Sequence, residues 1–470
     1  MNRIQLFLKA AAVGLLTLLL LIPLGMINGT INERQAYRQQ AIASVAASYA
    51  GPQTLLAPVV VLPYRVEVRS VRKDERGAPQ EFVEVLDRQW VYFPRDTTLD
   101  AKLVPAKKHR GLHEVRVYEL GGRMNGRFSV EVPTAVEDGT LLSLGEPFLS
   151  LGISDVRGLV GAPQLSLDRR ATPLQQGPGR GRGGNGLHAT LAPLQAGEKR
   201  DIAFDLRLTL GGTERFAFVP LADENHVRLQ SSWQHPNFDG QYSPRSPSIG
   251  ATGFDASWDI SALASGVQAQ YLSGASGDAG TSEVPEAVAM QEGRAPGTLE
   301  SLSVTLSEPV NLYSQADRAS KYGILFIALT FVGFFMFELI KRLAIHPIQY
   351  ALVGLALAIF FLLLLSLSEH IPFVWAYVSA STACIGLLGI YLSAVLRSAA
   401  RAFGFAGMLT LLYGALYGLL VSEDNALVLG SLMLFAILAA IMIVTRRIDW
   451  YALSASGPPP IPERTAVSEA

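Results

Sequence analysis

Five apolar blocks in the C-terminal third constrain the fold of this chain more than any other feature. The blocks are Tyr322–Ile340, Ile348–Leu367, Ile371–Leu396, Ala402–Val421 and Ala426–Val444. Each is about 20 residues long, the length at which an α-helix crosses the hydrocarbon core of a bilayer. Lipid offers no partners to backbone polar groups, so a spanning segment is either a helix or part of a closed barrel. Because the blocks do not alternate polar and apolar residues, residues 321–447 are predicted to form a five-helix transmembrane bundle.

The polar breaks between the blocks predict the orientation of this bundle. The breaks after the first, third and fifth blocks carry basic residues, namely Lys341 and Arg342, Arg397 and Arg401, and Arg446 and Arg447. The two other breaks, residues 368–370 and 422–425, contain Glu or Asp but neither Lys nor Arg. Basic loops lie in the cytoplasm by the positive-inside rule. We therefore expect the segment that precedes Tyr322 to lie outside the cytoplasm.

The N-terminus supplies a further apolar run, Ala10–Ile27, which follows Arg3 and Lys9. A cleaved signal peptide is the alternative interpretation. The run is longer than a usual signal core and is followed by no convincing small-x-small cleavage site, so we expect an uncleaved transmembrane anchor over residues 1–28. The prediction is a polytopic α-helical membrane protein with six transmembrane helices. Both termini would be cytoplasmic, with a disordered tail over residues 448–470.

Between the anchor and the bundle, the hydrophobic pattern changes twice. Within residues 29–54, apolar positions recur at helical spacing until Gly51-Pro52 stops the pattern, which predicts a juxtamembrane helix or stalk. In Ile202–Leu210 apolar and polar residues alternate, which is typical of a half-buried strand. Several such runs predict a large periplasmic β-rich, sandwich-like domain over residues 55–320, as one or two subdomains. The single cysteine, Cys384, lies in a membrane block, so this domain is expected to have no disulfide.

Two groups of residues outside the membrane blocks have the composition of a chemical site. His109 and His113 are four residues apart, but no further ligand accompanies them, and a loop that leads into a strand explains them better than a metal site. The second group, within Thr213–Asp239, consists of Asp223, Glu224, His226, Trp233 and His235. No recognised catalytic motif surrounds these residues. We therefore assign no catalytic, cofactor-binding or metal-binding residues, and expect neither a cofactor nor enzymatic activity.

Two further segments are predicted to be loops. Gln175–Gly186 is rich in Gly and Arg but lacks the Lys-Ser/Thr of a phosphate-binding loop. Ser273–Gly297 has little apolar content, as expected for a long mobile loop.

Ionisable residues near the membrane blocks are candidates for function because charge in a bilayer is costly. Glu338 lies close to Lys341 and Arg342, so local pairing explains it, and Glu369-His370 lies at a boundary that water reaches. A channel or transporter would need a polar path, for which the candidates are Ser366, Ser379, Ser381, Thr382 and Ser393. Closely spaced glycines predict helix contacts; they are Gly386, Gly389, Gly404, Gly407, Gly414 and Gly418.

Several local strings, together with the order of anchor, β-rich domain and bundle, resemble those of the CreD family of cell-envelope integrity inner membrane proteins. The strings are residues 110–118 (RGLHEVRVY), 216–221 (FAFVPL), 231–240 (SSWQHPNFDG), 253–258 (GFDASW), 321–326 (KYGILF), 346–350 (HPIQY) and 365–370 (LSLSEH). The resemblance implies a role in envelope integrity as an output of a CreBC-type two-component system, linked to tolerance of envelope-targeting toxins and β-lactam stress. It implies no catalytic residue, cofactor or ligand.

The expected function is therefore maintenance of the cell envelope at the inner membrane. The periplasmic domain would bind an envelope protein, a lipid or peptidoglycan, and the chain could form a homo-oligomer. The formal net charge of −1 gives no electrostatic case for nucleic acid. A transporter or channel that uses the bundle, and a membrane-bound envelope-processing enzyme, are the alternatives.

Overall fold

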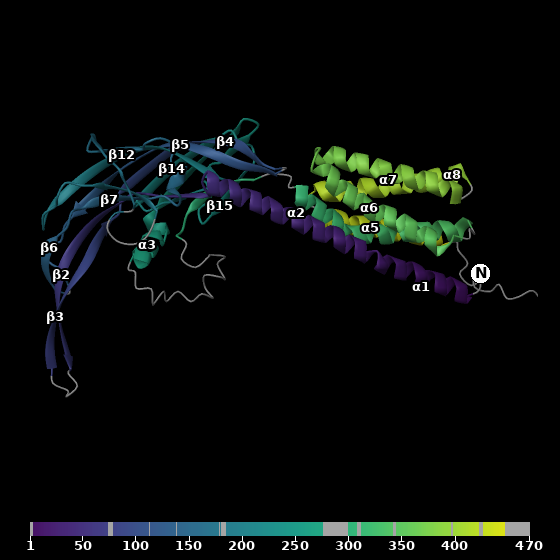
Figure 1. Ribbon diagram of the computed structural model, residues 1–470, viewed down its shortest axis with the longest axis horizontal. Helices are drawn as coiled ribbons and strands as arrows, with labels where there is room; N and C mark the ends of the chain where they lie inside the picture. Colours follow the sequence, from purple (N-terminus) through teal and green to yellow (C-terminus); the bar gives the residue numbers. More distant parts are fainter. Residues whose placement is uncertain are drawn as a thin grey trace, which may run out of the picture. The chain divides into compact units, whose positions relative to one another are not determined.

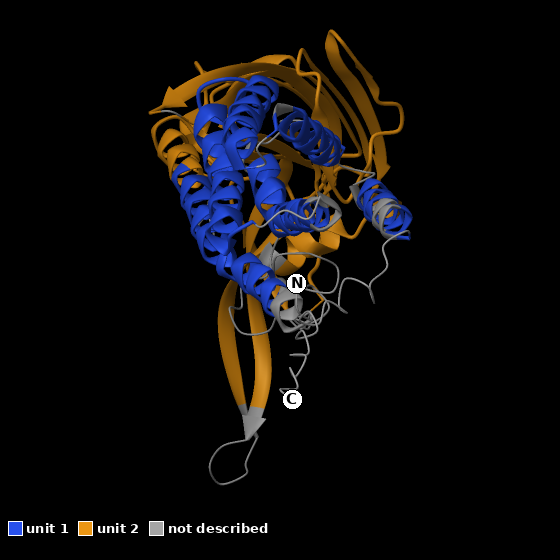
Figure 2. Cartoon of the chain, turned by 90° about the vertical axis from the view of Figure 1, so that its right-hand side faces the viewer, with its two compact units in different colours: residues 1–37, 310–470 blue, residues 38–309 orange. Residues whose placement is uncertain are grey.

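The computed structural model of this chain divides into two compact units (Figures 1 and 2). It describes residues 3–73, 79–111, 113–137, 139–177, 179, 185–275, 299–307, 312–341, 345–395, 398–422 and 426–446. The helical unit comprises residues 1–37 and 310–470, and the β unit comprises residues 38–309. The β unit is thus an insertion in the sequence of the helical unit, which the chain leaves and re-enters.

The helical unit contains five helices long and apolar enough to cross a membrane, counted over the described residues. Its helices are α1 (Arg3–Leu19), the first part of α2 (Leu21–Ser48), α5 (Leu312–Lys341), α6 (Pro347–Ser368), α7 (Phe373–Val395), α8 (Ala399–Val421) and α9 (Ala426–Thr445). One of the five spans is N-terminal and the other four come from α5 to α8. The predicted membrane protein is confirmed to this extent. The apolar helical stretch within α9, Val428–Ala439 over the described residues, is shorter, so the sixth crossing stays a prediction.

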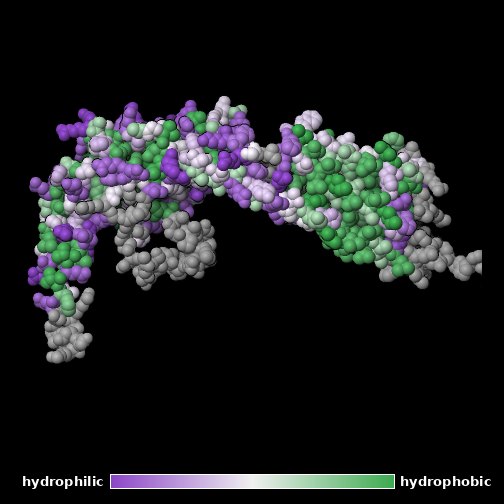
Figure 3. All heavy atoms as spheres, viewed as in Figure 1, coloured by the Kyte–Doolittle hydropathy of each residue, from purple (hydrophilic) through white to green (hydrophobic). Residues whose placement is uncertain are grey.

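Aromatic side chains fill the interior of the helical unit. Phe360 of α6 contacts Tyr377 of α7 and Tyr413 of α8, with ring centroids 5.5 Å and 4.6 Å away. The N-terminal helices also belong to this core, because Leu20 is buried at the junction of α1 and α2. A Cβ added to Gly354 of α6 would lie 2.2 Å from Leu20 Cδ1, so glycine permits this close approach. Figure 3 shows apolar atoms over the surface of these helices, as a lipid-facing protein requires.

The closely spaced glycines of α7 and α8 do not make the helix contacts that the sequence predicts. A Cβ added to any of them would meet no atom within 4 Å; they are Gly386, Gly389, Gly404, Gly407, Gly414 and Gly418. Within the chain, close packing instead uses other glycines, such as Gly323 against Leu24 and Phe361. The glycine spacing predicts a helix face without bulky side chains, but in the structure that face lies on the surface of the chain.

The β unit contains a four-stranded, a six-stranded and an eight-stranded sheet among its described residues. The four-stranded sheet has the order β1 (Gln53–Leu56), β13 (Arg215–Val219), β18 (Leu302–Leu306), β15 (Pro236–Gly240). The six-stranded sheet has the order β10 (Gln175–Gln176), β11 (Gly186–Thr190), β7 (Phe148–Gly152), β2 (Val59–Lys73), β3 (Pro79–Tyr92), and β6 (Thr140–Leu144) also pairs with β2. The eight-stranded sheet has the order β16 (Ser248–Gly250), β17 (Gly253–Ser261), β14 (Glu224–Ser231), β4 (Asp96–Arg110), β5 (His113–Glu131), β12 (Lys199–Thr213), β8 (Gln164–Leu167), β9 (Arg170–Thr172). Short helices η1 (Val156–Gly158), η2 (Ala262–Ala264) and α3 (Val267–Ala275) complete the unit.

Side chains from all three sheets meet in one apolar core. The alternation in Ile202–Leu210 is confirmed, since β12 buries every second residue of this stretch. Tyr118 of β5 is fully buried, and its hydroxyl donates a hydrogen bond of 2.7 Å to the Arg215 carbonyl, which ties the eight-stranded sheet to the four-stranded one. The large β-rich domain is therefore confirmed.

Strands β2 and β3 extend beyond the rest of their sheet as a two-stranded arm (Figure 1). Of the described residues, β6 pairs with β2 only as far as Glu67, so from Val68 to Lys73 strand β2 pairs with β3 alone. Val71, Val83 and Val85 of this arm are more than half exposed, and Figure 3 shows apolar atoms along it. Sequence reasoning identified no strand in Pro79–Tyr92. Its alternation is weak because both faces of an uncovered ribbon are exposed.

Candidate functional site

A buried carboxylate ties the N-terminal helix to the rest of the helical unit. Glu338 of α5 is 4% exposed and forms a salt bridge with Lys9 of α1. Its carboxylate also accepts a hydrogen bond of 2.7 Å from the Tyr350 hydroxyl and one of 3.3 Å from the Ile345 amide. Sequence reasoning named Lys341 and Arg342 as the partners of Glu338. The side chain of Lys341 and the whole of Arg342 lie outside the described residues, and the partner that the structure identifies is Lys9.

A second ion pair connects helix α2 with the end of α6. Arg34 Nε lies 3.5 Å from Glu369 Oε1, and the Glu369 side chain is only 12% exposed. Sequence reasoning placed Glu369 where water reaches it, but this side chain is largely covered by protein. Together with Lys9–Glu338, the pair makes the N-terminal helices a packed part of the helical unit.

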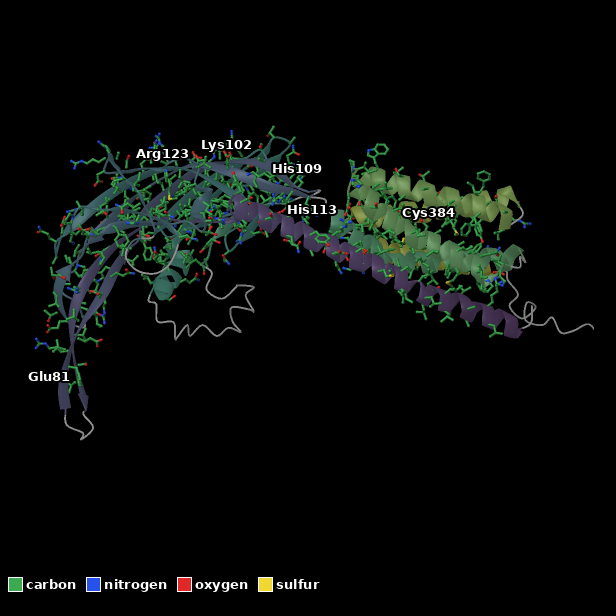
Figure 4. The ribbon with its side chains drawn as sticks, viewed as in Figure 1. Glu81, Lys102, His109, His113, Arg123 and Cys384 are labelled. Atoms are coloured by element: carbon green, nitrogen blue, oxygen red, sulfur yellow. The ribbon has the colours of Figure 1, made fainter. Side chains whose placement is uncertain are left out.

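The predicted polar path through the helices is not formed by the residues proposed for it. Of the five candidates only Ser381 is buried, and its hydroxyl donates hydrogen bonds to the Tyr377 and Val378 carbonyls of its own helix. Ser366, Ser379 and Thr382 are exposed on the helix surfaces, and Ser393 is half-buried with its hydroxyl bonded to Ile390. Cys384, labelled in Figure 4, packs among aromatic rings of the core.

The outer face of the eight-stranded sheet carries a row of paired charges. Strand register places Arg228 of β14 beside Asp100 of β4, and Asp100 beside Arg123 of β5. The flanking residues on these strands, such as Leu99 and Met124, face the core, so this row points outward. Figure 4 shows Lys102 and Arg123 on this side of the sheet. We name the row and its ion-pair partners the charged sheet face.

Bidentate ion pairs fix the side chains of the charged sheet face. Arg123 donates to both carboxylate oxygens of Asp205 at 2.9 Å and 2.6 Å, and Arg228 does the same to Asp255 at 3.1 Å and 2.6 Å. The hydrogen bonds from Arg123 and from Arg228 hold the pKa of Asp205 and of Asp255 below the usual value. A paired, ordered array of this kind offers hydrogen-bond donors and acceptors in fixed places, which suits recognition of a polar partner.

The histidines of the second sequence candidate are not brought together. His226 Nδ1 lies 2.7 Å from Asp259 Oδ1, with both side chains about half exposed. This pair lies on the eight-stranded sheet, whereas His235 precedes β15 of the four-stranded sheet. Asp223 accepts a hydrogen bond from Gln268 instead. Over the described residues no hydrogen bond links His226, His235, Asp223 and Glu224, so the structure shows no acid/base cluster there.

The first histidine pair lies at the hairpin between β4 and β5 (Figure 4). Strand β5 begins at His113, as predicted, but His109 lies within strand β4, which ends at Arg110, and not in a loop. His109 is paired in register with Glu114, 3.8 Å from its carboxylate, and its side chain is 70% exposed. In the part of the chain that the structure describes, no group of three or more His, Cys, Asp or Glu side chains could hold a metal ion.

The two predicted loops fall largely outside the described residues. From Ser273–Gly297 the structure describes only the end of α3, to Ala275, and from Gln175–Gly186 it describes the short strand β10, Gly177, Gly179 and the residues that lead into β11.

Helices of membrane-spanning length and a large inserted β unit define an integral membrane protein with an extramembrane domain. Comparison with protein families matches residues 5–451 to the family described as "Inner membrane protein CreD". The Inner membrane protein CreD of Escherichia coli (strain K12) is 34% identical over 460 residues, which cover 97% of this chain and 96% of that protein. The chain belongs to the CreD family and is an inner-membrane protein.

Among solved structures, an M1 zinc metallopeptidase from Deinococcus radiodurans aligns with 36% of this chain and 38% of its own, at 8% identity and a TM-score of 0.18. A yeast LTA4 hydrolase in complex with bestatin aligns with 35% of this chain and 26% of its own, at 5% identity and a TM-score of 0.16. Alignments with TM-scores this low support no statement about a shared fold or a shared function.

Proposed function

We propose that this protein maintains the integrity of the cell envelope, or its tolerance of stress, by binding an envelope component through its β unit. The observation that carries the proposal is the insertion of the β unit between helices that all belong to one helical unit. The Lys9–Glu338 and Arg34–Glu369 pairs make the N-terminal helices as much a part of that unit as α5 and α6. A domain attached to the bilayer at both ends stays near the membrane, which raises the effective concentration of any membrane-associated partner.

The charged sheet face is the surface that we propose for this binding. Its ion pairs keep Arg123 and Arg228 ordered, so less side-chain entropy is lost when a partner docks. Sugar hydroxyls, amides and carboxylates of envelope polymers, and the polar surfaces of envelope proteins, match this mixture of donors and acceptors. Binding without chemical turnover is part of the proposal.

The proposal also includes the topology expected from the sequence. Six crossings, with α9 as the last, would place both termini in the cytoplasm and the β unit in the periplasm. A reporter that is active only in the periplasm, fused after residue 205, tests this. Activity there and inactivity after Arg446 is the expected result, and the reverse pattern would remove the binding surface from the envelope.

In-cell photo-crosslinking tests the binding surface directly. A photoreactive amino acid at Lys102 or Arg123 should capture an envelope protein or peptidoglycan fragment. The same probe at Leu263 of η2, which is fully exposed and is not one of the residues of the charged sheet face, is the control. Capture of nothing from the charged sheet face, or equal capture from Leu263, would count against this surface.

Complementation of a deletion strain separates binding from folding. The double variant Arg123→Ala/Arg228→Ala should be produced at normal levels yet fail to restore envelope tolerance. Arg65→Ala, which removes the exposed Arg65–Asp87 pair between β2 and β3, is the matched control and should complement. Full rescue by the double variant would refute the proposed surface.

A further inference from the structure

The far edge of β3 is a long strand edge with no partner strand among the described residues. Strand β3 is the last member of its sheet, and among the described residues it pairs with β2 on its other side. Such an edge presents a row of backbone donors and acceptors that can pair with another strand. Phe82, Val83 and Val85 beside it are 42%, 58% and 52% exposed. The outer part of this edge, Pro79–Glu84, belongs to the two-stranded arm, and a two-stranded ribbon gains stability when a further strand pairs with it.

The residues along one face of β3 are complementary to themselves. In chain order this face carries an aromatic, an acidic, an aliphatic, a basic and an aromatic residue, which are Phe82, Glu84, Leu86, Arg88 and Trp90. In an antiparallel pair of strands related by a two-fold axis, one residue stands opposite its own copy. If that residue is Leu86, then Glu84 stands opposite Arg88 of the second strand, and Phe82 opposite Trp90. Each charge then meets its opposite, and each apolar residue meets another.

Strand β2 presents uncharged residues directly opposite the two charges of this face. On β2, Val68 stands opposite Glu84, and Tyr64 stands opposite Arg88. On the other face of the ribbon, by contrast, Arg65 stands opposite Asp87 and binds it at 3.2 Å. The β2 residues directly across from the charges of the self-complementary face are therefore both uncharged.

We propose that two copies of this chain pair through their β3 strands, antiparallel and centred on Leu86, to form a two-fold symmetric dimer. The six-stranded sheet then continues from one copy into the other. The neighbouring registers are poorer: centring on Glu84 puts two carboxylates face to face, and centring on Val85 places Val83 opposite Asp87. Insertion of the arm into lipid is disfavoured because the sequence from the end of β2 onward, residues 72–76, is Arg-Lys-Asp-Glu-Arg. This dimer does not depend on the function proposed above.

Cysteine crosslinking in native membranes tests the register. The full chain with Cys384→Ala removes the one natural cysteine. Directly opposed residues have Cβ atoms about 5 Å apart, close to the separation a disulfide needs. Leu86→Cys should therefore form disulfide-linked dimers on mild oxidation. Glu84→Cys alone and Arg88→Cys alone should not, because each lies about 13 Å from its own copy along the strand. Co-expressed, these two variants should crosslink to each other.

Two further variants separate specific pairing from collision and from misfolding. Val83→Cys, as exposed as its neighbours, is the matched control and should give no dimer band. Glu84→Arg should weaken dimerisation about tenfold, since it replaces two opposite-charge pairs with two like-charge pairs, and adding Arg88→Glu should restore it. Lack of a Leu86→Cys dimer would overturn the proposal. So would equal crosslinking at Val83, failure of the charge reversal to restore pairing, or capture of a different protein by β3.

Discussion

Replacing Lys9 with methionine should destabilise the helical unit more than removing both members of its ion pair. Lys9→Met keeps the length of the side chain but leaves the Glu338 carboxylate buried without its cation. Loss of one partner of a buried ion pair typically costs about 3–5 kcal/mol, whereas replacing both with uncharged residues is often close to neutral. The prediction follows from the 15% and 5% exposure of the two side chains.

The remaining contacts of Glu338 set the expected size of the loss. The Tyr350 hydroxyl and the Ile345 amide still donate to the carboxylate, so the cost of Lys9→Met should fall at the lower end of this range, about 3 kcal/mol. The double variant Lys9→Met/Glu338→Gln keeps an oxygen that accepts from Tyr350 and carries no buried charge. It should lose about 1 kcal/mol or less.

The assay is unfolding of the purified protein in mild detergent, followed by helical circular dichroism over a titration with SDS. Lys321→Met is the matched control, because Lys321 is 66% exposed and pairs with Asp317 one turn away. An exposed pair of this kind should contribute less than about 0.5 kcal/mol.

Equal losses in the single and double variants would refute the reasoning, since the stranded charge would then have no measurable cost. A mature protein that begins after residue 28 would refute it more simply, because Lys9 would be absent from the folded chain.

Three predictions concern the β unit. Burial raises the pKa of Tyr118 above the ordinary value of 10.0, so the stability that the neutral hydroxyl contributes is complete below about pH 10 and falls as the pH rises further. Tyr118→Phe should therefore be about 1 kcal/mol less stable than the wild type at pH 7. Between pH 10 and 12 the variant should lose less stability than the wild type, as measured by urea unfolding. The hydrogen bond from Arg157 lowers the pKa of Asp155, so this carboxylate stabilises the fold above about pH 4 and stabilises it less as the pH falls further. Asp155→Asn should cost up to about 1 kcal/mol of unfolding free energy at pH 7. The difference in stability between the variant and the wild type should shrink in acid. Gly253→Ala should destabilise the fold by at least about 2 kcal/mol, because φ of this residue is +120° and an added Cβ would collide with a backbone carbonyl. Gly250→Ala, where an added Cβ meets open space, is the control and should have little effect. Similar thermal midpoints for the two variants would contradict this prediction.

The sequence predicted the elements of this protein whose signal is local. An apolar block of membrane length needs no partner to be recognised, so the spans of α5, α6, α7 and α8 follow from composition alone. A half-buried strand such as β12 likewise shows its two faces in its own residues. The family resemblance, carried by short strings, is confirmed by the match over residues 5–451.

The structure alone decided which distant residues meet. Lys9 binds Glu338 across 329 positions of the chain, and no local pattern identifies such a partner. The glycines of α7 and α8 show the same limit, because spacing defines a smooth face of a helix but not what lies against it. Strand order is also set by pairing between remote segments, as when β14 pairs in parallel with β4. The period of the hydrophobic pattern and the length of an apolar block can therefore be read from consecutive residues. Ion pairs, sheet edges and contacts between buried side chains form only when the folded backbone brings remote residues within a few ångströms of each other.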